Sequence, residues 1–269
     1  MPGDQVVGRY GIGVDTVDLD AATDHGVPVV NVPDYCLDEV STHAMALILS
    51  CVRKVARFDR EVKEGTWDWK QGKPIHRLTD HTLGLAGFGR IPQTLVEKAA
   101  AFGLSVIAYD PYLTSDEIAE HGVRKVDFEQ LLTESDVLSV HVPLTDETRG
   151  LFDADAFEKM RSYAFIVNTA RGAVLDTDAL ADALDAGELA GAGLDVLPEE
   201  PPERSPLIGR DDVVLTPHVA WYSEDALAAL RRTVTNEVIG VLRGEDPMNP
   251  VKTAVLDEGL SPRHSTRLS

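Results

Sequence analysis

The segment from His81 to Pro111 constrains the fold of this 269-residue chain more than any other segment. An apolar run leads into Gly87-Phe88-Gly89, a stretch of helical spacing follows, and a second apolar run ends at Asp110. A strand, a glycine turn, a helix and a strand in this order form the unit that binds a dinucleotide, with the pyrophosphate at the helix start. Gly87 permits the tight turn, and Gly89 lets the backbone approach the pyrophosphate. A carboxylate at Asp110, about 20 residues on, can hold the ribose hydroxyls and would repel a 2′-phosphate, so the segment predicts NAD rather than NADP.

One position departs from the usual pattern of this unit. Pro92 stands where the pattern has a third glycine, which allows close packing of the helix on the strand. Proline is tolerated in the first turn of a helix, because the N–H that it lacks has no partner within the helix there. We therefore expect the helix to form, with a proline ring that can push it from the sheet and weaken cofactor binding.

Apolar runs and stretches of helical spacing alternate on both sides of this unit. We expect strands at 6–14 (running into a glycine loop), 27–31, 137–141, 164–168, 191–195 and 213–216. We expect helices at 18–25, 153–161, 176–186 and 223–243, one long helix over 38–64, and a loop over 65–77. Strands and helices that alternate in this way predict an α/β fold with a parallel, doubly wound sheet.

The chain is strongly acidic, with 45 acidic and 25 basic residues and a formal net charge of −20. This charge would repel a phosphate backbone, so we expect no binding to nucleic acid. The acids are spread along the chain, which suits a solvated surface adapted to high salt, where screening suppresses self-repulsion. Adaptation to high salt, as in a halophilic protein, is therefore a hypothesis that follows from composition.

Composition also bears on membranes, disulfides and metals. No apolar run approaches the roughly 20 residues that span a bilayer, so we expect no membrane association. The N-terminus lacks a basic region followed by an apolar stretch, and Cys36 and Cys51 make no disulfide framework. We therefore expect a cytoplasmic protein with reduced cysteines. No set of His, Cys, Asp and Glu has the spacing of a zinc site, which predicts no metal.

Five motifs, in this order along the chain, resemble the D-isomer-specific 2-hydroxyacid dehydrogenase family. They are Arg9–Asp15, Asn31–Cys36, Gly87–Ile91, Asn168–Gly172 and Thr216–Ser223. The second motif and the run Ala220–Ser223 are similar to the C-terminal-binding-protein-like branch of that family. The resemblance extends from about Val7 to about Pro250, which is nearly the whole chain.

The resemblance implies a Rossmann domain together with a truncated second domain that binds substrate. Residues 1–33 would be a remnant of the substrate domain, 34–228 the NAD-binding domain, and 229–269 a C-terminal helix returning to the substrate domain, with a frayed tail from Leu256. Family members carry several more strands and helices before the segment that begins here near Val6. We expect that either the coding start is placed too late or the substrate domain is shortened.

The resemblance also implies a catalytic set, which the chemistry of the residues supports. Arg171 follows an expected strand and offers a fixed, charged fork for a carboxylate or carbonyl oxygen. His218 would transfer the proton, because imidazole titrates near working pH. Its partner in the family is a glutamate just ahead of a proline, which matches Glu200, with Glu199 as the second choice. A neighbouring carboxylate favours the imidazolium and fixes the tautomer.

Other residues match the cofactor and substrate sites of the family. Besides Gly87, Gly89 and Asp110, those expected near the cofactor are Arg90, Ile91, His141, Pro143, Thr169, Ala170 and Asp195. Those expected near the substrate are Arg9, the backbone N–H groups around Ile12 and Gly13, and Trp221. His141 follows a strand that should line the cofactor cleft, and an ordinary structural role for it stays equally open.

Together these features predict an NAD-dependent oxidoreductase that interconverts a small 2-keto acid and a D-2-hydroxy acid. Two alternatives stay open. One is a phosphoglycerate or glyoxylate reductase of the same family, and the other is a non-enzymatic NAD(H)-gated binding or scaffold protein, which Pro92 and the shortened domain favour. We expect a homodimer through the helix over 38–64 and the loop with Trp67 and Trp69. The pocket that would bind the side chain of the substrate belongs largely to the missing N-terminal part. The sequence therefore does not indicate which substrate is bound.

Overall fold

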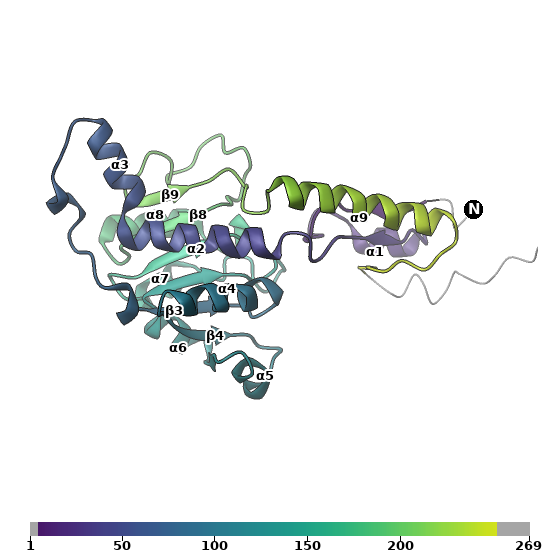
Figure 1. Cartoon of the computed structure of the whole chain (residues 1–269), viewed down its shortest axis with the longest axis horizontal. Coiled ribbons are helices and arrows are strands. Elements are labelled where there is room, and N and C mark those ends of the chain that lie inside the picture. The colour runs from purple at the N-terminus through teal and green to yellow at the C-terminus, as the bar shows by residue number, and fades with distance from the viewer. Residues whose placement is uncertain (1–4, 252–269) are drawn as a thin grey trace, which may run out of the picture. The chain divides into compact units, whose positions relative to one another are not determined.

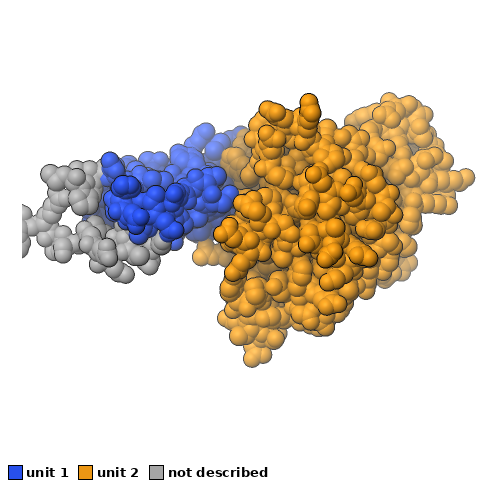
Figure 2. Space-filling model, turned by 180° about the vertical axis from the view of Figure 1, so that it is seen from behind, with its two compact units in different colours: residues 1–35, 223–269 blue, residues 36–222 orange. Residues whose placement is uncertain are grey.

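A computed structural model describes residues 5–251 of the chain. The chain divides into two compact units, one of residues Met1–Tyr35 with Ser223–Ser269 and one of Cys36–Tyr222 (Figure 2). The predicted domain limits lie a few residues away from these boundaries. The predicted frayed tail from Leu256 lies outside the described residues. None of the helices in residues 5–251 combines the length and the apolar character that crossing a membrane requires.

The larger unit is built on a seven-stranded sheet in which every neighbouring pair of strands is parallel. The order is β5-β4-β3-β6-β7-β8-β9, so the chain moves outward from β3 in one direction and then from β6 in the other. The strands are β3 (Thr82–Ala86), β4 (Ser105–Tyr109), β5 (Arg124–Lys125), β6 (Val137–Val140), β7 (Phe165–Asn168), β8 (Gly191–Leu194) and β9 (Val213–Leu215). The predicted parallel, doubly wound sheet is confirmed, and ligands in such sheets bind at the carboxyl ends of the strands near the point where the order reverses.

Helices cover both faces of this sheet, because successive strand residues point to opposite sides and both sides are apolar. One core contains Leu83 and Leu85 of β3 with α2 (Leu37–Arg53) and α4 (Arg90–Ala101), which lie side by side in Figure 1. The second core contains residues of α6 (Phe128–Glu134), α7 (Ala154–Lys159) and α8 (Thr177–Ala186). The other short helices of this unit are α3 (Val55–Lys63), α5 (Ser115–Ala119) and the 3₁₀ turns Trp69–Gly72, Leu78–Asp80 and Gly172–Val174.

The prediction of one long helix over 38–64 is wrong. The segment forms α2 and a separate helix, α3 (Val55–Lys63), divided at Lys54, whose φ of 54° is left-handed. The Lys54 N–H still donates to Cys51 O at 3.1 Å, which ends α2 with a typical left-handed cap. The apolar spacing continues into α3, but α3 has no buried residue, whereas α2 buries one face along its length. Burial on the sheet therefore determines where the first helix ends.

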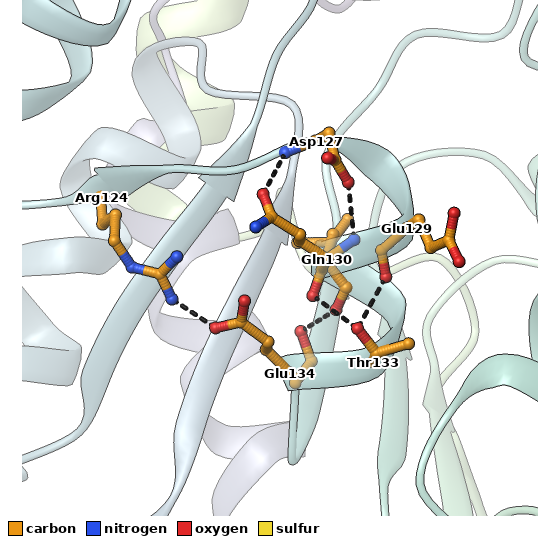
Figure 3. Close-up of polar contacts among 8 residues, drawn as sticks. Arg124, Asp127, Glu129, Gln130, Thr133 and Glu134 are labelled. Carbon is orange, nitrogen blue, oxygen red and sulfur yellow. Dashed lines mark hydrogen bonds and ion pairs between the residues drawn. The ribbon is translucent and has the colours of Figure 1, made fainter.

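The edge of the sheet at β5 was not predicted. β5 has only two residues, and its Arg124 pairs with Glu134 at the end of α6 (Figure 3). The helix begins with a reciprocal cap, in which Gln130 N–H donates to Asp127 Oδ1 at 2.7 Å and Asp127 N–H donates to Gln130 Oε1 at 3.2 Å. A short, charged edge strand of this kind resists pairing with another sheet. The Asp-x-x-Gln spacing was a usable signal for the helix, while β5 carries no apolar pattern.

The smaller unit consists of β1 (Val7–Gly8), α1 (Leu19–Asp24), β2 (Val29–Val30) and α9 (Glu224–Leu242). β1 pairs with β2 in parallel, and Gly8 lies so close to α9 that a Cβ there would be 2.7 Å from a Val238 methyl group. The predicted strand over 6–14 is confined to β1, because Gly11 has a φ of 140° and the chain turns there.

Candidate active site

Most of the expected site residues of the larger unit lie in segments that follow the carboxyl ends of its strands. Because all seven strands are parallel, these ends form one edge of the sheet. Gly87 follows β3, Asp110 follows β4, His141 follows β6, Thr169, Ala170 and Arg171 follow β7, Asp195 and Glu200 follow β8, and His218 follows β9. The fold therefore brings to one edge residues that are up to 131 positions apart in sequence, the separation of Gly87 and His218 (218 − 87).

The glycine turn has the geometry that a pyrophosphate needs. Gly87 has a φ of 90°, and a Cβ there would lie 3.1 Å from the backbone of His141. A Cβ at Gly89 would meet no atom within 4 Å, so the space above this turn is open. Arg90 and Ile91 are the first residues of α4, where the N–H groups of the first turn and the helix dipole favour an anion.

Asp110 holds this turn from the next strand. Its Oδ2 accepts from Phe88 N–H at 2.9 Å, and its Oδ1 accepts from Tyr112 N–H at 2.9 Å. The side chain also lines an open pocket of about 360 Å³. The other lining residues are Tyr109, Pro111, Ser115, Lys125, Val126, Asp127 and Gln130. The pocket adjoins the glycine turn through Asp110, as the adenosine half of a dinucleotide requires.

Pro92 is the third residue of α4 and is buried. The helix spans twelve residues in all, continues past Pro92 to Ala101 and buries Leu95, Val96 and Ala99, so the proline does not break it. The helix forms as expected from the position of Pro92 in the first turn. The expected weakening of cofactor binding stays a prediction.

Two polar groups near the expected nicotinamide end differ in their bonding. The Thr169 hydroxyl is buried without a hydrogen-bond partner, as expected of a group that bonds to a ligand when one is present. His141 Nε2 lies 2.9 Å from Ser139 Oγ, and burial lowers the pKa of His141 to about 4. His141 is therefore neutral near pH 7. Pro143, two residues further on, is exposed.

His218 and Glu200 form a direct pair. Nδ1 of His218 lies 2.5 Å from Oε2 of Glu200, and Oε1 of Glu200 accepts from Leu197 N–H at 3.0 Å. Glu200 rather than Glu199 makes this contact. With Nδ1 protonated and directed at the carboxylate, Nε2 is the ring nitrogen that can exchange a proton with a ligand.

Arg171 lies in a turn that is tied to the Glu200 loop. Asn168, a buried residue that was not predicted, accepts from Ala170 N–H at 2.9 Å and donates to Arg171 O at 2.9 Å. The next residue, Gly172, touches the backbone beside Leu197, because a Cβ at Gly172 would lie 2.0 Å from the Leu197 carbonyl carbon. The arginine turn therefore packs directly on the loop that positions Glu200.

Asp195 is a buried hydrogen-bond acceptor for the loop of residues 216–220, which contains His218. Its carboxylate accepts from the Thr216 hydroxyl at 2.6 Å and from the N–H groups of Val219 and Ala220, both at 2.9 Å. Its backbone oxygen accepts from His218 N–H at 2.7 Å. The side chain of Asp195 has no exposed surface in this structure, and its expected place near the cofactor stays a prediction. Trp221 packs edge-on against Tyr222, with ring centroids 5.5 Å apart.

The expected substrate residues near the N-terminus lie in the smaller unit. Arg9 Nε donates to Gly13 O at 2.9 Å, and Arg9 Nη1 donates to Tyr10 O. Ile12 O accepts from Asn31 Nδ2 at 2.8 Å. The guanidinium thus holds its own loop, and its role toward a substrate stays a prediction. Within residues 5–251, no three His, Cys, Asp or Glu side chains are grouped so that they could hold a metal ion.

Comparison with known proteins identifies the family. Residues 45–220 match the NAD binding domain of the D-isomer specific 2-hydroxyacid dehydrogenases. The chain belongs to this family. The dehydrogenase resemblance and the expected NAD-binding domain are thereby confirmed, and the narrower likeness to the C-terminal-binding-protein-like branch stays a prediction.

Similar proteins in this family are named for several different substrates. The chain is 40% identical over 252 residues to a D-3-phosphoglycerate dehydrogenase of Archaeoglobus fulgidus, covering 93% of this chain and 47% of that protein. It is 38% identical to a glyoxylate reductase of Thermococcus litoralis, covering 94% and 78%. The crystal structure of the D-lactate dehydrogenase from Aquifex aeolicus with NAD and lactic acid has a TM-score of 0.85 at 30% identity, covering 92% and 80%. The chain spans about half the length of the phosphoglycerate dehydrogenases it matches.

Proposed function

We propose that the chain is an NAD-dependent oxidoreductase that interconverts a small 2-keto acid and a D-2-hydroxy acid. The observation that carries this proposal is the His218–Glu200 pair at 2.5 Å, set at the carboxyl edge of an NAD-binding sheet beside the turn of Arg171. An imidazole held by a carboxylate can transfer a proton, and a guanidinium can bind the carboxylate of a substrate. Both functions are needed for this reaction.

Each of the residues Arg171, His218 and Glu200 has a separate role in the proposed reaction. NAD, when bound in its reduced form, supplies the hydride to the keto carbon. Arg171 binds the substrate carboxylate through its planar fork. His218 donates the Nε2 proton to the keto oxygen, while Glu200 accepts a hydrogen bond from Nδ1 and fixes the orientation of the ring. In the reverse reaction, neutral His218 takes the hydroxyl proton at Nε2.

The cofactor site supports binding of a dinucleotide by the chain's own groups. The glycine turn and the start of α4 offer N–H groups to the pyrophosphate, and Asp110 offers carboxylate oxygens to the adenosine ribose. The unpaired Thr169 hydroxyl is available to the nicotinamide end. A carboxylate at Asp110 also disfavours the 2′-phosphate of NADP.

The test replaces His218 by Ala and measures turnover of glyoxylate with NADH, and of D-lactate and D-3-phosphoglycerate with NAD. We expect the rate to fall by roughly 10²–10⁴-fold, the usual contribution of an acid–base group. His25→Ala is the matched control, because His25 is an exposed histidine at the end of α1. Undiminished turnover in His218→Ala would remove this histidine from the mechanism.

The same assay decides between the proposed enzyme and the two alternatives. A preference for D-3-phosphoglycerate or glyoxylate would identify the substrate class among those named for the relatives. NADH binding to the unaltered chain with no turnover of any of the three substrates would support the NAD(H)-gated binding protein.

We also propose that the protein is a homodimer formed through α3 and the loop that follows it. We further propose that it is cytoplasmic and adapted to high salt. Trp67 and Trp69 are 89% and 68% exposed, and Val55 and Val62 of α3 are exposed as well, so this region carries apolar surface that a partner copy would cover. Sedimentation in molar KCl tests the state of assembly, with a Trp67→Ser/Trp69→Ser variant as comparison. A monomer in the unaltered chain contradicts the proposal. A thermal midpoint that falls as salt is added would contradict the salt adaptation.

A further inference from the structure

His43, on the second turn of α2, contacts the segment that carries His218. Its Nε2 lies 2.9 Å from the Thr216 hydroxyl oxygen and 3.5 Å from Asp195 Oδ1. We propose that His43 is a positioning residue, which holds the loop of residues 216–220, and with it His218, through Thr216 and Asp195. This inference rests on the proposed role of His218 as the proton-transfer group.

The hydrogen positions along this chain of contacts follow from the donors present. Thr216 has one hydroxyl hydrogen, and at 2.6 Å it is donated to the Asp195 carboxylate, which is an acceptor only. The Thr216 oxygen must therefore accept, so His43 carries a hydrogen on Nε2. The sequence of bonds runs from His43 Nε2–H to Thr216 and from Thr216 to Asp195. Each bond in such a series polarises the next and strengthens it.

The packing of α2 on β8 places His43 at this point. His43, Leu47 and Cys51 are four residues apart and share one face of α2. A Cβ at Gly193 of β8 would lie 3.2 Å from Leu47 Cβ and 3.1 Å from Cys51 Sγ, so this row runs directly against the strand. Asp195 is two residues beyond Gly193 and points to the same side, where it meets His43. The absence of a side chain at Gly193 thus brings the helix close enough for the histidine to reach the loop.

The loop needs this restraint, because the backbone of His218 is unusual. Its φ of 52° is left-handed, which is unfavourable for a residue with a Cβ and persists only when neighbouring contacts fix it. The Asp195 carboxylate accepts from Val219 and Ala220 on one side of His218 and from Thr216 on the other. Asp195 is wholly buried, so its orientation depends on the groups bonded to it. His43 is the group outside the loop that contacts both Thr216 and Asp195.

Two variants of His43 separate a hydrogen bond from simple packing. His43→Gln keeps an N–H donor near the Nε2 position, whereas His43→Leu fills space without a donor. We expect His43→Leu to lower kcat for glyoxylate reduction about tenfold, the effect of one lost hydrogen bond, with little change in KM for glyoxylate or NADH. We expect His43→Gln to retain most of the rate. Cys51→Ala on the same row of α2 is the control, which should lower the melting temperature without changing kcat.

Amide hydrogen exchange measured on the full chain gives a second, activity-independent readout. The N–H groups of Val219 and Ala220 should exchange about tenfold faster in His43→Leu, and at the wild-type rate in His43→Gln and Cys51→Ala. If His43→Leu does not fold, Thr216→Val removes the middle of the chain of bonds and should give the same exchange result. Unchanged exchange, or equal losses in the Gln and Leu variants, would overturn the proposal. If the unaltered chain turns over no substrate, the proposed function fails, and the exchange rates alone decide the role of His43.

Discussion

Replacing Gly172 by Ala should disrupt the candidate active site through backbone contact alone. The new Cβ would lie 2.0 Å from the Leu197 carbonyl carbon and 2.3 Å from both the Leu197 oxygen and the Pro198 nitrogen. Ordinary contact begins near 3.4 Å, so the two segments must separate by about 1.4 Å (3.4 − 2.0). Every atom contacted belongs to backbone, so no side-chain rotation can relieve the overlap. Overpacking of this kind typically costs about 1–3 kcal/mol.

The displacement reaches the proposed catalytic pair, His218 and Glu200, through the hydrogen bond that Leu197 N–H donates to Glu200. Leu197 N–H holds Glu200 Oε1, and Glu200 Oε2 holds His218. A shift of about 1 Å in a catalytic group can lower the rate roughly 10²-fold, so Gly172→Ala should lose both stability and kcat.

Gly240→Ala is the matched control for this substitution. Gly240 lies inside α9, where the new Cβ would meet only the Glu245 side chain, with Oε2 at 3.3 Å and Cβ at 3.9 Å. Helix propensity then favours alanine by about 1 kcal/mol. Thermal unfolding and NADH-linked reduction of glyoxylate measure both effects. A Gly172→Ala variant that matches the unaltered chain in melting temperature and kcat would refute the idea that close backbone approach sets the geometry of Glu200.

Three further predictions test other parts of the larger unit. Asp110→Ala should weaken NADH binding, because the carboxylate holds Phe88 N–H in the glycine turn and lines the expected adenosine pocket. A fluorescence titration with NADH and NADPH checks it, and an unchanged preference for NADH would contradict the role of Asp110. His141 should make the fold less stable in acid: its folded pKa of about 4 lies below the ordinary 6.5, so the unfolded chain binds the proton first, and stability is lost as pH falls from about 6.5 to 4. Urea unfolding at pH 5 and pH 7.5 should show a smaller difference in His141→Gln than in the unaltered chain. Gly84→Ala should cost about 1–3 kcal/mol, because its Cβ would lie 1.9 Å from Ser135 Oγ; urea unfolding checks this, and Ser135→Ala in the same chain should recover part of the loss.

The sequence predicted the parts of the fold in which local pattern and burial agree. The strands from β3 onward lie between two apolar layers, so most of them appear as continuous apolar runs, and Gly87 and Gly89 mark the turn between β3 and α4. The break at Lys54 could not be predicted, because the apolar spacing continues across it into α3. It ends α2 because the residues that follow, in α3, find no apolar layer to cover. β5 was missed for a related reason, since two charged residues at a sheet edge show no apolar pattern.

The sequence located the proposed reactive side chains better than the residues that hold them. His218 and Glu200 could be proposed from their chemistry and from resemblance, and the structure brings them together at 2.5 Å. His43 offered no such signal, because a helix histidine is an ordinary residue until its partners are known. Asn168 opens one of the motifs of the resemblance but was not named as a site residue. Their roles depend on contacts between segments far apart in sequence, such as the one that joins His43 to Thr216 across 173 positions.

One arrangement recurs where strands of the larger sheet end. Asn168 closes β7 and accepts from Ala170 N–H, Asp195 follows β8 and accepts from Val219 and Ala220, and Asp110 follows β4 and accepts from Phe88. In each case a polar side chain fixed at a strand end accepts N–H groups from a loop expected to touch a ligand. Loops are mobile by default, and a site needs reactive groups held to within about 0.5 Å. Acceptors at strand ends transfer the rigidity of the sheet to those loops. A carboxylate at the end of a buried strand of this sheet can therefore hold a loop in place as well as contact a ligand. Asp195, whose side chain has no exposed surface, holds a loop in this structure.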